Sequence, residues 1–159
     1  MAFYGKEYQD GKAFVTLFFK FGGDDITIDK FLNIFEKKFK EAIKKEEMLE
    51  EYGYYEIITK SSSKIELVIP AAYHSEISEL LDDAAQNLSS IHVLRVIIFT
   101  DIDEDGTAGY TLAEVKEGKE FETELGYASR FYNIEERDEA IQNILDPFII
   151  KWLQLETVK

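Results

Sequence analysis

The sequence predicts a single α+β domain over residues 1–159, with an antiparallel-rich sheet in ferredoxin-like β-α-β-β-α-β order. A further hairpin, a strand and a C-terminal helix are expected to extend it. Segments rich in β-branched and aromatic residues alternate with segments whose apolar residues recur every three or four positions. Turn-forming residues separate these segments, and no Pro-, Gly- or Ser-rich linker divides them. A chain of 159 residues with 45% hydrophobic content is long enough to bury one core.

The first strand is predicted over residues 12–21 (KAFVTLFFKF), because this run is β-branched and aromatic and ends at Gly22-Gly23. A long amphipathic helix is expected next, with Thr27 as its N-cap and its end near residues 52–53. The spacing i, i+4 predicts its buried stripe, which contains Phe31, Phe35 and Phe39.

A β-hairpin is predicted over residues 54–69, where two strand-like runs flank three serines and Pro70 ends the second run. Residues 75–88 are predicted to form the second helix, since their apolar residues gather on one helical face. Both of these early helices are expected on the same face of the sheet.

Residues 91–100 (IHVLRVIIFT) form the most strongly β-forming run and predict a buried strand, with residues 110–115 as its hairpin partner. A further strand is predicted over residues 121–127. The spacing from Asn133 to Glu136 resembles a capping box and predicts the start of the C-terminal helix. Asp146-Pro147 is expected to break that helix and to cap a new one, because Pro suits the first helical position behind an Asp cap.

The net charge of −14 is distributed unevenly along the chain. Residues 1–60 carry 10 Lys against 12 Asp and Glu, whereas residues 61–159 have a net charge of −12. Between Lys64 and Lys116 the only basic residue is Arg95. A field of this sign repels nucleic acid and anionic membranes and attracts basic proteins. The alternative interpretation is that the acidity only keeps a small protein soluble.

The composition predicts a cytoplasmic protein. There is no cysteine, which is typical of a reducing compartment. The first ten residues contain charged side chains and no apolar run, so no signal peptide is expected. No stretch reaches the roughly 18 uninterrupted apolar residues of a membrane span.

An acidic motif with calcium-loop spacing follows the buried strand, at Asp101, Asp103, Glu104 and Asp105 before Gly106. An EF-hand loop requires a Glu at its twelfth position and helices on both sides. Here the twelfth residue is Leu112 and the flanking segments are predicted strands. A calcium site of another kind, held by Asp101, Asp103 and Asp105, stays open beside the simpler interpretation as a hairpin turn.

A second acidic feature is the carboxylate row, defined as Glu120, Glu122 and Glu124. These alternate with Phe121, Thr123 and Leu125, so on a strand all three carboxylates would lie on one face, about 6.6 Å apart. Such a row would imitate a line of phosphates; the alternative is an ordinary half-exposed strand. Tyr110 and Tyr127 are expected on the same partner surface, since Tyr is enriched at interfaces.

Catalytic chemistry is poorly represented, and the sequence favours a protein that is not an enzyme and has no cofactor. His74 and His92 are the only histidines, and neither belongs to a nucleophile or metal-ligand motif. Both are expected to be neutral and structural. Gly22-Gly23 precedes two aspartates, which would repel a phosphate group.

The first hypothesis for function is an acidic inhibitor that blocks a basic nucleic-acid-handling enzyme, for example a nuclease, by charge mimicry. Immunity proteins and phage-type anti-defence proteins share this combination of small size, acidity and missing catalytic residues. The partner surface would contain Asp101, Asp103, Glu104, Asp105, Tyr110, Tyr127 and the carboxylate row. Two alternatives stay open: a ferredoxin-like sensor or accessory domain that binds a small ligand or calcium, and a small carboxylate-dependent hydrolase.

Overall fold

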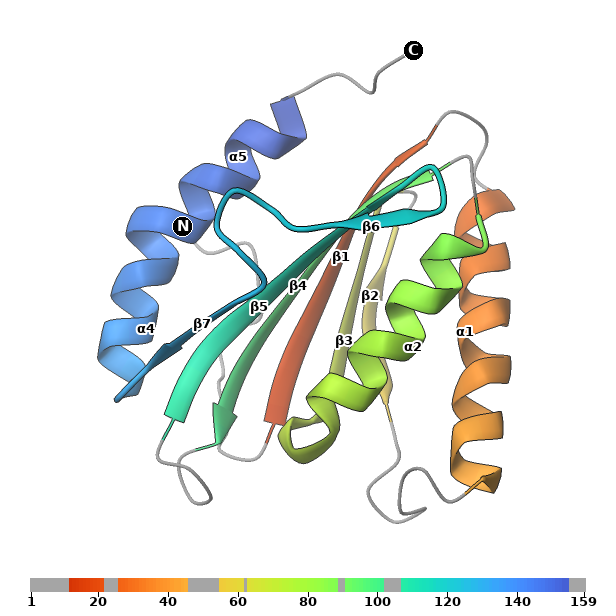
Figure 1. Ribbon diagram of the computed structural model, residues 1–159, viewed down its shortest axis with the longest axis horizontal. Helices are drawn as coiled ribbons and strands as arrows, with labels where there is room; N and C mark the ends of the chain where they lie inside the picture. The colour runs from red at the N-terminus through yellow and green to blue at the C-terminus, as the bar shows by residue number, and fades with distance from the viewer. Residues whose placement is uncertain are drawn as a thin grey trace.

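The computed structural model describes residues 12–21, 26–45, 55–61, 63–88, 91–101 and 107–154. It has a mixed α+β fold in which helices cover both faces of one antiparallel sheet (Figure 1). No helix in this part of the chain is long and apolar enough to cross a membrane. In chain order the elements are β1 (Lys12–Phe21), α1 (Ile26–Lys44), β2 (Glu56–Lys60), β3 (Lys64–Pro70), the 3-10 turn η1 (Ala71–Tyr73), α2 (His74–Gln86), β4 (Ile91–Asp101), β5 (Thr107–Lys116), β6 (Lys119–Phe121), β7 (Ala128–Phe131), α4 (Ile134–Ala140), the π-helical turn η2 (Ile141–Leu145) and α5 (Asp146–Gln154).

The sheet has seven strands in the order β2-β3-β1-β4-β5-β6, and β7 also pairs with β5. β6 pairs with the end of β5, and β7 pairs with its beginning, so the two short strands share the outer edge of β5. The predicted hairpin of residues 91–100 and 110–115 is confirmed as β4 and β5, which pair from Asp101↔Thr107 to His92↔Lys116.

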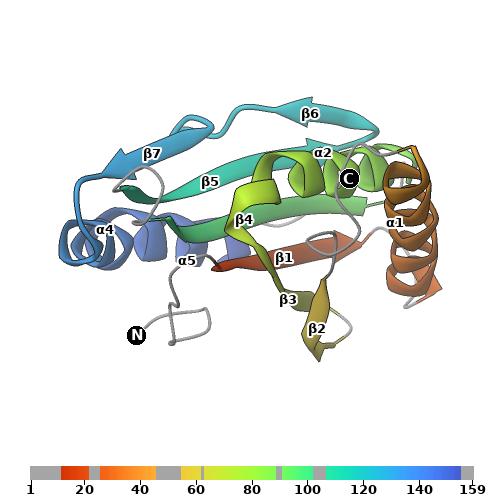
Figure 2. The same ribbon diagram turned by 90° about the horizontal axis from the view of Figure 1, so that it is seen from below.

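One face of the sheet is covered by α1 and α2, as the sequence predicts (Figure 2). The Phe stripe of α1 is buried, and the Phe31 ring meets Phe19 of β1 edge to face, with 5.4 Å between ring centroids. The helix begins at Ile26, so the expectation that Thr27 caps it is wrong, because Thr27 already lies within the first turn. The end expected near residues 52–53 lies outside the described residues.

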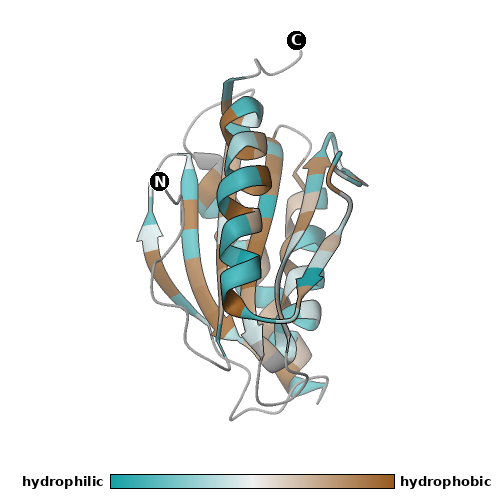
Figure 3. Ribbon diagram, turned by 90° about the vertical axis from the view of Figure 1, so that its left-hand side faces the viewer, coloured by the Kyte–Doolittle hydropathy of each residue, from teal (hydrophilic) through white to brown (hydrophobic). Residues whose placement is uncertain are grey.

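The opposite face of the sheet is covered by the C-terminal helical layer, whose outer side is largely hydrophilic (Figure 3). β4 therefore lies between two cores, and every residue from Val93 to Thr100 is buried. Alternate residues of this strand belong to different cores: Val93, Ile97 and Phe99 pack beneath α1 and α2, whereas Leu94, Val96 and Ile98 pack beneath α4 and α5. This double coverage explains why apolar residues occupy both parities of β4.

The C-terminal layer is fixed to the sheet by the fully buried side chain of Arg137. Its Nη1 donates hydrogen bonds to the carbonyl oxygen of Phe99 at 2.8 Å and to the hydroxyl of Thr100 at 2.6 Å. Asn133 caps α4, as predicted, by accepting a 2.8 Å hydrogen bond from the Glu136 N–H.

The predicted helix break at Asp146-Pro147 is wrong. Asp146 has helical angles (φ −59°, ψ −45°), and α4, η2 and α5 follow one another without interruption. Pro147 has no N–H and its ring conflicts with the carbonyl four residues earlier in a regular α-helix. The π-helical turn that immediately precedes α5 widens the helix at this point and accommodates the proline without ending it.

Candidate functional site

Three of the acidic residues expected to face a partner, Glu120, Glu122 and Glu124, lie along the chain that follows β5. The chain reverses at Glu117 and Gly118, whose φ angles of 54° and 75° are both positive, as a tight hairpin turn requires. It returns as β6, which is only three residues long, and all three are exposed.

A second turn interrupts the strand predicted over residues 121–127. The hydroxyl of Thr123 accepts a hydrogen bond from the Leu125 N–H at 3.2 Å and donates one to the Gly126 carbonyl at 2.9 Å. Gly126 has a φ of 83°, a left-handed conformation that glycine adopts without steric cost. β7 begins only at Ala128, so the prediction of one strand over residues 121–127 is wrong.

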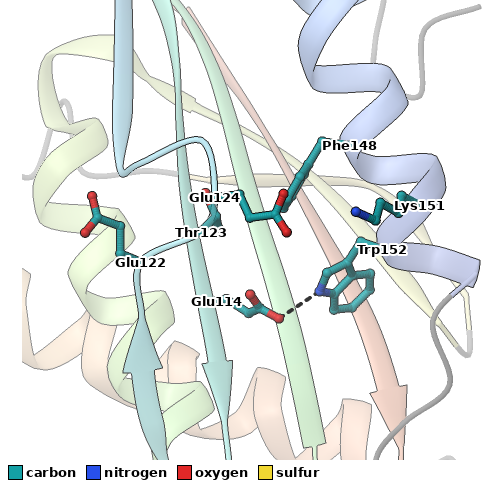
Figure 4. Close-up of a pocket in the computed structure, with 7 residues that line it drawn as sticks. All are labelled: Glu114, Glu122, Thr123, Glu124, Phe148, Lys151 and Trp152. Carbon is teal, nitrogen blue, oxygen red and sulfur yellow. Dashed lines mark hydrogen bonds between the residues drawn. The ribbon is translucent and has the colours of Figure 1, made fainter.

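The carboxylate row is separated by this turn, because period-two spacing holds only within a strand and only Glu120 lies in one. Glu120 lines a groove beside α2. Glu124 lies beside α5, whereas the side chain of Glu122 points away from α5 (Figure 4). All three are exposed, but the expectation of one regularly spaced face is wrong.

The other residues predicted to contact a partner differ in their exposure to solvent. Tyr110 is only 2% exposed and packs against Phe131 in the core beneath α4 and α5, so its expected place on the surface is wrong. Its position on β5 opposite Ile98 turns it toward that covered face. Tyr127 is 43% exposed. Outside the described residues lie the side chain of Asp101 and the whole of Asp103, Glu104 and Asp105.

A pocket of about 170 Å³ lies between the turn of residues 123–126 and α5 (Figure 4). The carboxylate of Glu124 and the ammonium group of Lys151 flank its mouth, and aromatic rings form one wall. The lining residues are Glu114, Glu122, Thr123, Glu124, Phe148, Lys151 and Trp152.

Glu114 is the most constrained carboxylate of this pocket. The same oxygen, Oε2, lies within hydrogen-bonding distance of His92 Nε2 and accepts a 2.9 Å hydrogen bond from Trp152 Nε1. The His92 hydrogen bond, opposed by partial burial and assisted by Trp152, lowers the pKa of Glu114. Lys20 donates to the Trp152 carbonyl, and its Nζ lies 4.0 Å from the ring centroid. This cluster ties the end of α5 to β1, β4 and β5.

A larger groove of about 450 Å³ lies between α2 and β6. At its base, Arg95 Nε lies 2.9 Å from Asp82 Oδ1, and the two side chains are 7% and 10% exposed. Burial raises the pKa of Asp82 to about 7; Arg95 opposes this rise, and Glu120 adds to it. Exposed Glu79 and Asp83 complete a lining that is mostly acidic.

The two sites permit different chemistry. The pocket beside α5 combines carboxylates with an aromatic wall, which suits a cationic side chain. The groove beside α2 contains a carboxyl group that titrates near neutral pH, which suits proton transfer or a basic group that displaces the proton. Within the described residues, no three His, Asp or Glu side chains come together as a metal site would require.

Sequence reasoning missed both buried clusters. The signal for the groove was Arg95, a single basic residue in a strand predicted to be buried. A buried arginine needs an acidic partner. The partner, Asp82, is 13 positions away on α2, and nothing local connects the two. The signal for the pocket was His92 together with Glu114, whose proximity becomes visible only when the β4–β5 register is known. His92 pairs with Lys116 and Leu94 pairs with Glu114, so His92 and Glu114 are diagonal neighbours on adjacent strands.

Comparison of this chain with models of known protein families, with curated proteins and with solved structures finds no match.

Proposed function

We propose that this protein is an acidic inhibitor that binds a basic nucleic-acid-handling enzyme, in the manner of an immunity protein or a phage-type anti-defence protein. The observation that carries the proposal is the surface of residues 119–127. Phe121 is 47% exposed and Tyr127 is 43% exposed, and the exposed carboxylates of Glu120 and Glu122 lie near Tyr127. Aromatic rings supply contact area at an interface, and the charges supply direction and speed of association.

The acidic groove beside α2 extends this surface, since Glu120 lines the groove and belongs to the row. A Lys or Arg side chain of the partner that enters the groove would meet the carboxylates of Glu79, Asp83 and Glu120. The inhibitor would thereby occupy a channel that the enzyme uses for phosphate groups. Association would be fast and sensitive to salt.

The fold in which this surface is set is, in our proposal, ferredoxin-like over its first six elements. The chain order β1-α1-β2-β3-α2-β4 and the sheet order β2-β3-β1-β4 support this assignment. β5, β6, β7 and the C-terminal helical layer would then be the addition that carries the acidic surface.

The test of the inhibitor proposal has two stages. Co-purification with mass spectrometry identifies bound proteins, and the association rate of each purified partner is then measured by surface plasmon resonance. Double replacement Glu122→Lys and Glu124→Lys should slow association at least tenfold at low salt. The matched control, Glu36→Lys with Glu41→Lys, makes the same charge change on α1 and should have little effect. Equal effects of the two variants would show that only net charge matters and would contradict this surface.

A carboxylate-dependent hydrolase is a second candidate, favoured by one observation. Asp82 holds a proton near neutral pH beside Glu120, which is the state that general acid–base catalysis requires. Asp82→Asn would abolish hydrolysis and leave partner binding intact. Replacement of Glu122 and Glu124 would have the opposite effect, so the two variants together distinguish the candidates.

A further inference from the structure

The pocket beside α5 is negatively charged and has an aromatic wall. Three carboxylates and one ammonium group line it, and Phe148 and Trp152 form the wall. The side chains of Glu124 and Lys151 point toward the space between them, and Glu114 lies beside Trp152 (Figure 4). The volume of about 170 Å³ is close to that of an engineered cavity of roughly 150 Å³ that binds benzene, so a small planar group fits.

Glu114 brings one unoccupied carboxylate oxygen to this pocket. Its side-chain hydrogen bonds, with His92 Nε2 and from Trp152 Nε1, both use Oε2. Within the described part of the chain, Oε1 accepts no hydrogen bond. The side chain is 22% exposed, and its lowered pKa keeps it ionised at neutral pH. A charged oxygen that is held in place beside a cavity favours a ligand that donates a hydrogen bond to it.

The charged groups at the mouth of the pocket are not paired with each other. Among the described residues, neither the Glu124 carboxylate nor the Lys151 ammonium group forms an ion pair or a side-chain hydrogen bond, and both side chains are exposed. Glu124 therefore adds a second acceptor, which a ligand can reach together with Glu114. Lys151 opposes the binding of a cation, but the carboxylates of the lining outnumber it.

The aromatic wall favours a cation over a neutral ligand. Lys20 of β1, which is not among the residues that line the pocket, already places its Nζ 4.0 Å from the centroid of the Trp152 ring. Inside the pocket, the partly buried ring of Phe148 offers a cation a similar surface. A guanidinium group suits this lining better than an ammonium group, because it is planar, is less strongly hydrated and donates several hydrogen bonds in one plane.

We propose that this pocket binds a guanidinium group, which donates hydrogen bonds to Glu114 Oε1 and to the carboxylate of Glu124 and stacks on Phe148. The group can belong to a free small molecule or to an arginine side chain of a partner protein, since both present the same chemistry. Such binding does not depend on the proposed inhibitor function, because the pocket and its charges are the same in either case.

Fluorescence titration of the full chain tests the proposal, because Trp152 is the only tryptophan and its indole N–H donates to Glu114. Propylguanidinium should change the emission in a saturable way, with a dissociation constant of about 1 mM for a ligand of this size. Propylammonium should bind about threefold more weakly, or worse. Propylurea has a similar shape without the charge and should not bind.

Replacement of single residues should shift the affinity for propylguanidinium in opposite directions. Glu114→Gln and Glu124→Gln should each weaken binding about fivefold or more, because each removes a charged acceptor. Lys151→Gln should tighten binding about twofold, because it removes the like charge at the mouth. Glu139→Gln, exposed on α4, makes the same charge change as the glutamate variants outside the pocket and should have no effect. Circular dichroism checks the fold of each variant, and exposed Glu124 provides the test if Glu114→Gln does not fold.

Several results would overturn the proposal: a titration without saturation, equal binding of propylurea, or tighter binding of propylammonium than of propylguanidinium. Unchanged affinity in the folded glutamate variants would also overturn it, since the cation would then bind elsewhere. A glycine pentapeptide with a central arginine and blocked ends separates the two sources of the guanidinium group. If the peptide binds, the pocket accepts an arginine side chain of a protein; if only propylguanidinium binds, the ligand is a free small molecule.

Discussion

Arg95 and Asp82 illustrate how single residues of this protein depend on their neighbours. Both side chains are buried, and the ion pair between them offsets part of the hydration that each loses. Glu120 reaches the same place from β6 and brings a second negative charge, so Asp82 keeps its proton to an unusually high pH. The composition shows the abundance of acids, but the identity of the one that titrates near neutrality depends on the packing of α2 against the sheet.

The stability of the protein should therefore fall as the pH rises from about 4 to about 7 because of Asp82. In the unfolded chain its pKa returns to the ordinary value of 3.8, whereas in the folded protein it is about 7. Between these values the folded state holds a proton that the unfolded state has lost, so raising the pH favours unfolding, and the effect levels off above pH 7.

Urea unfolding at several pH values measures this contribution, and Asp82→Asn isolates it. The amide does not titrate, so the variant should lose the part of the pH dependence that lies between pH 4 and 7. Asp83→Asn, one residue away and exposed, is the control and should keep the wild-type profile. Identical profiles for wild type and Asp82→Asn would contradict the raised pKa of Asp82.

Arg137 is expected to stabilise the contact between α4 and the sheet through its buried hydrogen bonds. Arg137→Met keeps a long apolar side chain but removes the donors to Phe99 and Thr100, which leaves buried oxygen atoms without their hydrogen bonds. The free energy of unfolding should fall by about 3 kcal/mol. Glu139→Gln on the exposed side of the same helix should change it by less than about 0.5 kcal/mol. Equal stability of Arg137→Met and wild type would mean that packing alone holds α4 on the sheet.

At the scale of elements, the sequence predicted most of the long segments and failed at the short ones. β4 and α1 are long runs whose composition and period indicate one structure each, and both were found. The prediction of a strand over residues 121–127 is wrong because it rested on the alternation of polar and apolar residues. Gly126 and the hydroxyl of Thr123 instead close a turn there. The prediction of a helix break at Pro147 is wrong because a π-helical turn accommodates the proline, and no local sequence pattern indicates such a turn.

β7 depends on a glycine in the neighbouring strand. A Cβ atom at Gly109 would overlap the backbone oxygen of Ser129 and the ring of Phe99, so β7 can approach β5 only because this position has no side chain. Gly109→Ala should therefore detach β7 and lower the free energy of unfolding by about 2 kcal/mol.

Amide hydrogen exchange provides the measurement for β7, because residues 128–131 should lose protection in Gly109→Ala while β4 keeps it. Ser129→Ala is the matched control, since it removes a hydroxyl from β7 and leaves the backbone oxygen in place. Unchanged protection of β7 in the glycine variant would show that the strand shifts to make room.

For the whole molecule, the central question is what the acidity does. Helices cover both faces of the sheet, and the exposed carboxylates of Glu120, Glu122 and Glu124 follow one edge of it, in β6 and the turn after β6. Concentrated like charge destabilises a folded protein through self-repulsion. Because concentrated charge lowers stability, we expect it where a binding partner recognises the charge. Charge spread evenly over the surface would be enough to keep the protein soluble.

Neutralising the carboxylate row separates these two explanations without the partner. The triple replacement Glu120→Gln, Glu122→Gln and Glu124→Gln should raise the melting temperature by a few degrees at about 10 mM salt, because it removes repulsion and relieves the buried Asp82. The gain should fade at about 1 M salt, where the Debye length is about 3 Å. Glu36→Gln should bring no gain, since Glu36 pairs with Lys40 on α1 at 3.1 Å. If the row serves a partner, the triple variant stays as soluble as the wild type; precipitation of the folded variant would assign the acidity to solubility instead.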